Sequence, residues 1–136
     1  MTTKNMMYDH PAYIAVIPQP TGSITGAAGV GTKYAAFTAL VIKSVTLAAT
    51  TVGTSADVIS VLKVATGSGT NTSTTTVTYG TMGSAAFFGN FTPAVATNQI
   101  TCNQGDTFWV QKGTDATAVF VGQIETVVVP LSNVTV

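Results

Sequence analysis

The segment from Ile100 to Pro130 constrains the fold of this chain more than any other. After a turn at residues 103–106, Phe108 and Val110 alternate with Thr, Trp and Gln, which is the period-2 pattern of a strand with one buried face. A polar loop follows, and an apolar run rich in Val then continues to the proline. Because β-branched side chains lose freedom in a helix, this run favours strand over helix. The segment therefore predicts a β-hairpin or its equivalent, against which the rest of the chain packs.

We expect one face of this hairpin to form much of the core. The side chains predicted to be buried are Phe108, Val110, Val119, Val121, Ile124, Val127 and Val129. We interpret Gly122 as a bulge at which the phase of the second strand changes. Cys102 alternates within the preceding strand and is expected in the core, and a lone cysteine can form no intramolecular disulfide. Trp109 has the opposite phase to its neighbours and is expected to face outward.

The chain before this hairpin also shows strand patterns. Apolar or alternating runs cover residues 40–48, 58–65, 74–82 and 86–91, separated by segments rich in Gly, Ser, Thr and Asn. No stretch has the i, i+3, i+4, i+7 spacing of a long amphipathic helix. We expect seven or eight strands in an all-β fold: an antiparallel β-sandwich, jelly-roll-like, with an extended N-terminal arm. An immunoglobulin-like connectivity is the second choice, because strand patterns do not separate the two.

Residues 1–32 differ in composition from the rest. They contain three of the five prolines, at positions 11, 18 and 20, followed by a Gly-rich stretch. We therefore divide the chain into an extended N-terminal arm or linker, residues 1–32, and a β-sandwich domain, residues 33–136. Within the arm, residues 13–17 are compatible with a short edge strand because prolines flank them. A disordered tail is the alternative interpretation of this arm.

Charge is scarce, and this excludes several classes of function. Charged residues make up 7% of the 136, where about 25% is typical, and the net charge is zero with no Arg. The five Lys residues are scattered, so we expect neither nucleic-acid binding nor attachment to an anionic membrane surface. The most apolar stretch, residues 34–52, contains Lys43 and several Thr, so no membrane span is expected. An uncharged surface favours association, and we expect a homo-oligomer, most simply a trimer.

No catalytic, metal-binding or cofactor-binding motif is present. His10 and Cys102 are the only nucleophile–base pair to consider, and one lies in the predicted arm while the other lies in the predicted core. The carboxylates are scattered along the chain: Asp9, Asp57, Asp106, Asp115 and Glu125. Three of these aspartates sit at strand ends or turns, where Asp is common for local hydrogen bonding. We therefore expect no enzyme, no metal and no cofactor. Outward-facing aromatic residues such as Trp109 leave glycan stacking as a binding alternative.

Several segments together resemble a known family: LVIKSVTLAATT, DVISVLKVATGSGT, TTTVTYGTMGS, and ITCNQGDTFWV followed by VFVGQIETVVV. They are similar to the β-sandwich decoration, or cement, proteins on the heads of tailed bacteriophages. The resemblance covers roughly residues 38–130. It implies a virion protein, made in the host cytoplasm, whose homotrimers sit on the capsid surface over junctions of major capsid subunits.

The same resemblance implies that the arm reaches onto the shell formed by the major capsid protein. Its expected capsid-contact residues are Tyr8, Tyr13, Ile14, Ile17, Pro18 and Pro20. The four apolar side chains would anchor the arm, and the two prolines would keep it extended. Similar small domains occur in phage fibres, so a fibre or adhesin-like module that binds surface glycans is the second hypothesis.

Overall fold

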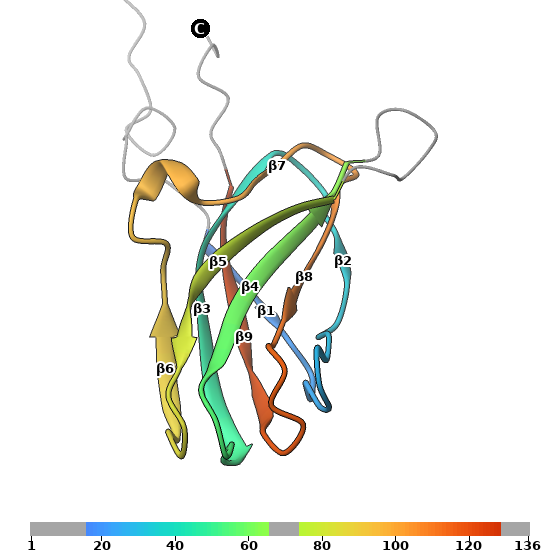
Figure 1. The fold of residues 1–136 in the computed structure, drawn as a ribbon. Coiled ribbons are helices and arrows are strands. Elements are labelled where there is room, and N and C mark those ends of the chain that lie inside the picture. Colours follow the sequence, from blue (N-terminus) through green and yellow to red (C-terminus); the bar gives the residue numbers. More distant parts are fainter. Residues whose placement is uncertain (1–15, 66–73, 129–136) are drawn as a thin grey trace, which may run out of the picture.

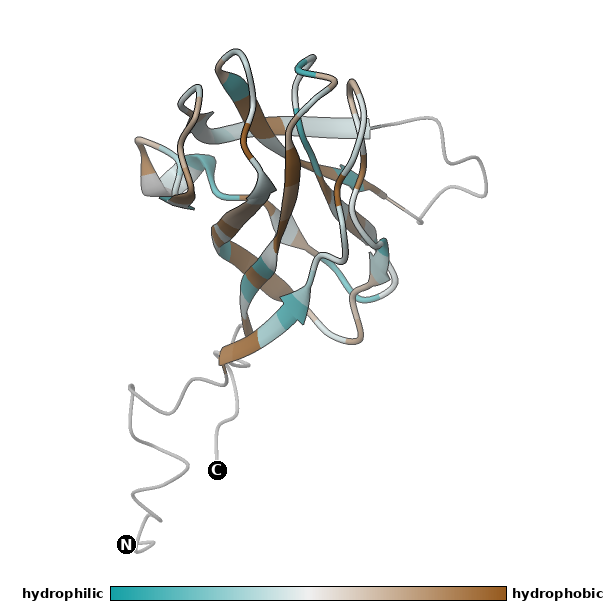
Figure 2. Ribbon diagram, turned by 90° about the horizontal axis from the view of Figure 1, so that it is seen from below, coloured by the Kyte–Doolittle hydropathy of each residue, from teal (hydrophilic) through white to brown (hydrophobic). Residues whose placement is uncertain are grey.

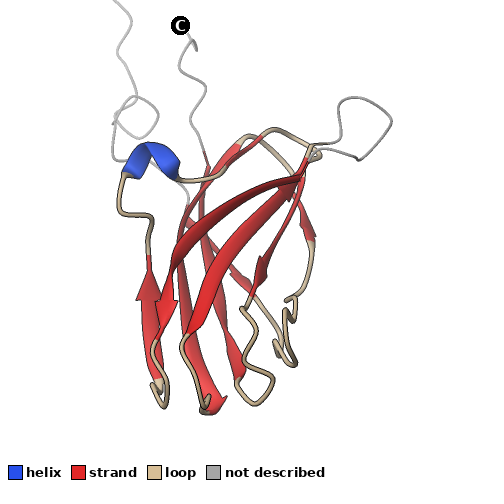
Figure 3. Ribbon diagram, in the orientation of Figure 1, coloured by secondary structure: helices blue, strands red, loops and turns tan. Residues whose placement is uncertain are grey.

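The computed structural model describes residues 16–65 and 74–128, and within them two antiparallel sheets pack face to face (Figure 1). Sheet A has the order β1-β9-β3-β6, with β7 also paired to β3, and sheet B has the order β2-β8-β4-β5. The strands are β1 (Val16–Pro20), β2 (Tyr34–Ala35), β3 (Leu40–Thr51), β4 (Asp57–Val64), β5 (Thr74–Met82), β6 (Phe88–Phe91), β7 (Thr101–Cys102), β8 (Thr107–Gln111) and β9 (Val119–Val128). One short helical turn, η1 (Ala96–Asn98), lies between β6 and β7 (Figure 3).

The strand order confirms the expected fold. The chain passes between the two sheets after β1, β2, β3, β5, β7 and β8, so each sheet is assembled from distant parts of the sequence. Leaving aside the two-residue β7, four strands face four in the arrangement of a jelly roll. The protein is therefore an all-β antiparallel sandwich with jelly-roll connectivity, and the immunoglobulin-like alternative is excluded.

The sandwich begins earlier in the chain than the composition predicts. Every residue of β1 pairs with β9, and Thr21 and Ile24, which follow β1, are fully buried. Ile24 also forms an isolated bridge with Phe120. Residues 16–32 thus belong to the sandwich, and the predicted boundary after residue 32 is wrong. Any arm is limited to residues 1–15, which lie outside the described residues.

Two prolines inside β1 explain why the sequence of this strand predicts an arm. Thr21 donates its N–H to the carbonyl of Gly122 on β9 (2.9 Å), so the odd-numbered residues of this strand direct their N–H groups toward β9. Pro18 and Pro20 have the opposite parity, and their missing N–H groups face the open side of the sheet. A proline there costs no ladder hydrogen bond, which is why edge strands tolerate it. The same prolines make this edge a poor template for a further strand.

The core lies between the two sheets and draws on both. Figure 2 shows hydrophobic residues along the strands of the sandwich. The fully buried aliphatic side chains are Ile24, Leu40, Ile42, Val45, Leu47, Ile59, Val61, Val110 and Ile124. Tyr79 joins the sheets with its hydroxyl, which donates to the carbonyl of Ile42 (2.5 Å) and accepts from the N–H of Ile100 (2.9 Å). Burial raises the pKa of Tyr79 to about 12, because the phenolate would lose its hydration.

The hairpin face is partly as predicted. Phe108, Val110 and Ile124 are buried, as expected, and Cys102 is also buried. Among the other predicted core residues, Val119, Val121 and Val127 are only half-buried. Val129 lies outside the described residues.

The error in β9 comes from its glycine. Phe120, Ile124 and Thr126 are all buried, so the strand keeps one phase and Gly122 causes no bulge. A Cβ on Gly122 would overlap the backbone carbonyl of Thr46, which explains the glycine by close approach of β3. The irregular pairings lie instead on β3, around positions 43 and 50.

Candidate interaction surface

Two adjacent phenylalanines stand out on the surface at the start of β6. Phe87 is 74% exposed and Phe88 is 65% exposed. Phe88 pairs with Ala48 of β3, which in turn pairs with the half-buried Val121 of β9. We call these four residues the apolar corner. Exposed aromatic side chains that adjoin small apolar ones are typical of sites that contact another macromolecule.

The strand period places one phenylalanine of β6 inside and another outside. Phe91 is 9% exposed and belongs to the core. Its ring lies so close to Gly80 and Gly89 that a Cβ on either glycine would overlap it. Both glycines are therefore explained by the close approach of this ring. Because positions three apart on a strand point to opposite faces, the inward Phe91 forces Phe88 outward.

The turn that carries Phe87 is held by backbone contacts. Ala85 donates its N–H to the carbonyl of Gly53 (3.1 Å), and Phe87 accepts from the N–H of Ala49 (2.9 Å). Ala85 has a φ of +57°, a conformation that costs energy for a residue other than glycine. The turn is thus fixed on both sides, by the loop after β3 and by β3 itself.

The loop beneath that turn depends on one carboxylate. Asp115 accepts hydrogen bonds from the N–H groups of Ser55 (2.6 Å), Thr54 (2.7 Å), Thr117 (2.7 Å) and Ala118 (3.0 Å). The hydroxyls of Thr54 and Ser55 bind the same carboxylate. These donors, with the Ser55 backbone first, hold the pKa of Asp115 well below its usual range. Asp115 thereby joins the loop between β3 and β4 to the loop between β8 and β9.

A buried ion pair lies behind this carboxylate. Lys112 Nζ is 3.2 Å from Asp57 Oδ2, and the two side chains are 0% and 1% exposed. The ammonium also donates to the carbonyls of Gly26 (3.0 Å) and Asp115. Asp57 Oδ1 accepts the N–H of Asp115 (3.0 Å). Lys112, Asp57 and Asp115 together form a cluster that connects three loops at the end of the sandwich that carries Phe87.

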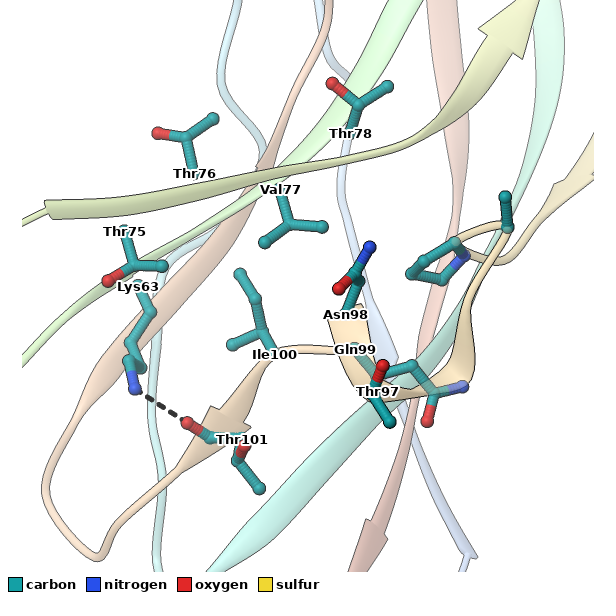
Figure 4. Close-up of a pocket in the computed structure, with 12 residues that line it drawn as sticks. Lys63, Thr75, Thr76, Val77, Thr78, Thr97, Asn98, Gln99, Ile100 and Thr101 are labelled. Atoms are coloured by element: carbon teal, nitrogen blue, oxygen red, sulfur yellow. Dashed lines mark hydrogen bonds between the residues drawn. The ribbon is translucent and has the colours of Figure 1, made fainter.

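A groove of about 610 Å³ runs along the free side of β5 (Figure 4). Val77 and Ile100 face each other across it, and uncharged polar side chains of residues 75–78 and 97–101 surround them. Lys63 lies at one end and donates to the carbonyl of Thr101 (2.7 Å). The groove offers hydroxyl and amide groups above a small apolar floor.

Of the predicted capsid-contact residues, the structure describes Ile17, Pro18 and Pro20. Tyr8, Tyr13 and Ile14 lie outside the described residues. Ile17 is half-buried in β1, where its carbonyl accepts the hydroxyl of Thr126 (2.7 Å), while Pro18 and Pro20 are exposed on the same strand. β1 and β6 are opposite edges of sheet A, so two strands separate these three residues from Phe88.

The other residues considered from the sequence have structural roles. Trp109 faces away from the core, as its phase predicts, yet it is only 8% exposed, and Lys33 Nζ lies 4.5 Å from the centre of its ring. Burial raises the pKa of the Cys102 thiol to about 11, which keeps it a poor nucleophile. Asp106 Oδ2 accepts the N–H of Asn103 (2.9 Å), in the local role expected at a turn.

Within residues 16–65 and 74–128, no three His, Cys, Asp or Glu side chains are placed to hold a metal ion. No helix in this described part has the length and hydrophobicity needed to cross a membrane. The chain matches no family model, no curated protein and no solved structure. The site must therefore be judged by its own chemistry.

Proposed function

We propose that this protein is a structural virion protein that decorates and stabilises a phage capsid by binding over junctions of major capsid subunits. The observation that carries the proposal is the apolar corner, whose two exposed phenylalanines lie at a fixed turn of a jelly roll with few charged residues. Such a surface is suited to holding a protein partner rather than to chemistry, because no described group there has a catalytic arrangement. The sequence resemblance to decoration proteins supports the same proposal.

The corner is suited to a permanent attachment. Aromatic side chains supply much of the binding energy of protein interfaces, and an anchor that is already fixed loses little entropy on binding. The turn contacts at Ala85 and Phe87 provide that order before the partner arrives. With so few charges in the chain, attachment depends weakly on salt. The proposed partner is the major capsid protein, and the proposed assembly is a homotrimer on the capsid surface, formed after synthesis in the host cytoplasm.

Decoration of purified shells by paired variants tests the corner. Replacing Phe87 and Phe88 with Ser should leave the fold intact, since both side chains are already exposed, but weaken shell binding at least tenfold. Phe37 provides the matched control, because it is also an exposed phenylalanine, with 55% of its surface accessible. It lies before the start of β3, whereas Phe87 contacts Ala49 near the end of that strand. Phe37→Ser should bind as the wild type does. Equal binding by the double variant would exclude the corner as the attachment site.

Residues 1–15 are proposed as a second contact, through Tyr8, Tyr13 and Ile14. Deleting residues 1–15 keeps β1 whole and tests the arm without damaging sheet A. We expect unchanged thermal unfolding and weaker binding to shells. A deletion variant that decorates shells as well as the full chain would exclude residues 1–15 as a capsid contact.

The groove along β5 favours a second candidate, a fibre or adhesin-like module that binds surface glycans. Its hydroxyl and amide side chains could bind sugar hydroxyls. Trp109 gives this candidate little support, because its ring is covered. The two candidates differ in a direct measurement: Thr76→Val and Asn98→Ala would abolish glycan binding without affecting shell binding. Saturable binding of an oligosaccharide by the wild type and its loss in these variants would favour the glycan module.

A further inference from the structure

The buried pair Lys112–Asp57 brings an amine and a carboxyl group into contact out of reach of water. Their atoms Nζ and Oδ2 are 3.2 Å apart, and neither side chain is more than 1% exposed. The ring of Phe120 lies 5.8 Å from Nζ and helps to exclude solvent. In such surroundings both charged forms lose the hydration that favours them.

The two oxygens of Asp57 differ in their partners. Oδ1 accepts the backbone N–H of Asp115 at 3.0 Å. Oδ2 is buried and has no hydrogen-bond partner within the described residues, although Nζ is near, so the contact lacks hydrogen-bond geometry. Buried polar atoms are normally hydrogen-bonded, and an exception requires an explanation.

The amine is oriented by its other contacts. Lys112 Nζ donates to the carbonyl oxygens of Gly26 (3.0 Å) and Asp115. The third position on Nζ is directed toward Asp57, whose Oδ2 is 3.2 Å away. The site therefore holds an amino group beside a carboxyl group, with an N–H donor on the carboxyl oxygen that does not have to leave.

We propose that Lys112 and Asp57 condense into an intramolecular amide cross-link. In the proposed step one proton passes from Nζ to Oδ2, the lone pair that this frees on Nζ attacks Cγ of Asp57, and the N–Cγ bond forms. In the tetrahedral intermediate the negative charge develops on Oδ1, where the N–H of Asp115 stabilises it. One proton passes from the nitrogen to the departing hydroxyl, the Cγ–Oδ2 bond breaks, and one water molecule leaves. An amine and an acid give an amide and water, so the step needs no oxidant, reductant or co-reactant.

The cross-link explains why Oδ2 of Asp57 has no hydrogen-bond partner among the described residues, and it removes the free-energy cost of burying two charged groups. Oδ2 is the atom that departs as water, while Oδ1 remains as the amide carbonyl and keeps its bond to Asp115. The product carries no charge, which removes the cost of burying two ions in a chain that has few. It also covalently joins the start of β4 to the loop after β8. This inference does not depend on the proposed function.

Intact mass measured under denaturing conditions tests the cross-link. The wild type should weigh one water molecule less than its sequence mass. Lys112→Met should have its full sequence mass, whereas the matched control Lys43→Met, at an exposed lysine, should still lack one water. Tandem mass spectrometry should then identify a branched peptide joining Asp57 to Lys112, which distinguishes the cross-link from an aspartyl succinimide of the same mass.

A wild-type protein at its full sequence mass would overturn the proposal, as would loss of water in Lys112→Met. Loss of water with no branched peptide would overturn it too, since a succinimide would then explain the mass. The decisive result comes from the wild type itself, so poor folding of the lysine variant does not weaken the test.

Discussion

Two ion pairs in this sandwich join the same kinds of group in opposite surroundings. Lys112 and Asp57 lie 3.2 Å apart with both side chains buried, whereas Lys43 and Glu125 lie 4.0 Å apart on sheet A with side chains 58% and 33% exposed. An exposed pair is screened by water and contributes about 0–1 kcal/mol. A buried pair is held because removing one partner leaves an uncompensated charge. In a chain with so few charges, the position of a charge therefore matters more than its presence.

The difference also concerns what each pair supports. The exposed pair spans neighbouring strands that already share a hydrogen-bonded ladder. The buried pair lies where three loops meet, and backbone bonds such as that from the Lys112 N–H to the Gly29 carbonyl (2.9 Å) also join those loops. Through Asp115 and the loop at Gly53, this cluster connects to the turn that presents Phe87. The end of the sandwich that carries the apolar corner thus owes its order to polar contacts, while the strands owe theirs to the core.

The largest effect should come from replacing Lys112, because the variant loses the group that satisfies the buried Asp57, as an ion pair or as the proposed amide. Lys112→Met leaves the carboxylate of Asp57 buried without its partner, and the free energy of unfolding should fall by about 3–5 kcal/mol. Equilibrium unfolding in urea measures this change. A loss below roughly 1 kcal/mol would show that the buried pair stabilises the fold no more than an exposed pair does.

Asp115 should make the loop cluster sensitive to acid. Its pKa is lowered in the folded state, so its contribution to stability is complete above the unfolded pKa of 3.8 and is lost as pH falls below that value. Asp115→Asn should lower the melting temperature at pH 7 and flatten the acid limb of the stability–pH curve. Thermal unfolding between pH 2 and 7 checks both. An unchanged acid limb in the variant would mean that other carboxylates govern the acid response.

The hydroxyl of Tyr79 makes neutral buried hydrogen bonds, whose loss can be compared with the loss of the Lys112–Asp57 contact. Tyr79→Phe leaves the N–H of Ile100 and the carbonyl of Ile42 without their buried partner, at a cost of roughly 1–3 kcal/mol. Because the folded pKa of about 12 exceeds the unfolded value of 10.0, its stabilisation is complete below pH 10 and is lost as pH rises toward 12. The variant should show a smaller alkaline loss than the wild type. A cost as large as that of Lys112→Met would show that losing the Lys112–Asp57 contact is no costlier than losing a neutral buried hydrogen bond.

The smallest effect should come from the exposed pair. Lys43→Met should change the free energy of unfolding by less than about 1 kcal/mol, and added salt should reduce even that difference. Urea unfolding at low and high ionic strength measures it. A change above 2 kcal/mol would place the exposed pair in the same class as the buried one.

Strand alternation predicted much of the fold because it acts locally. The face of β8 and the burial of Cys102 follow from residues that are neighbours in sequence. The same reasoning gives the wrong result at Gly122, because a glycine in a strand can indicate either a bulge or the close approach of a neighbouring backbone. Gly122 was interpreted as a bulge, but it stands where β3 comes too close for a side chain, and the phase of β9 does not change.

The candidate site was harder to predict because its parts are distant in the sequence. Asp57 is predicted at a strand end, and only the order of sheet B brings it beside Lys112. The exposure of Phe88 depends on which residue of β6 packs over the two glycines, a choice that alternation alone does not make. The prolines of β1 indicated an arm, although an edge strand tolerates them equally well.

The most direct test of the proposed function is the ratio of this protein to the major capsid protein in purified virions. Sedimented particles should contain the protein at one fixed ratio that saturates as more is added. Because attachment is mainly apolar, washing with several hundred millimolar salt should leave that ratio unchanged. Absence of the protein from the particles, or its removal by the salt wash, would contradict the account.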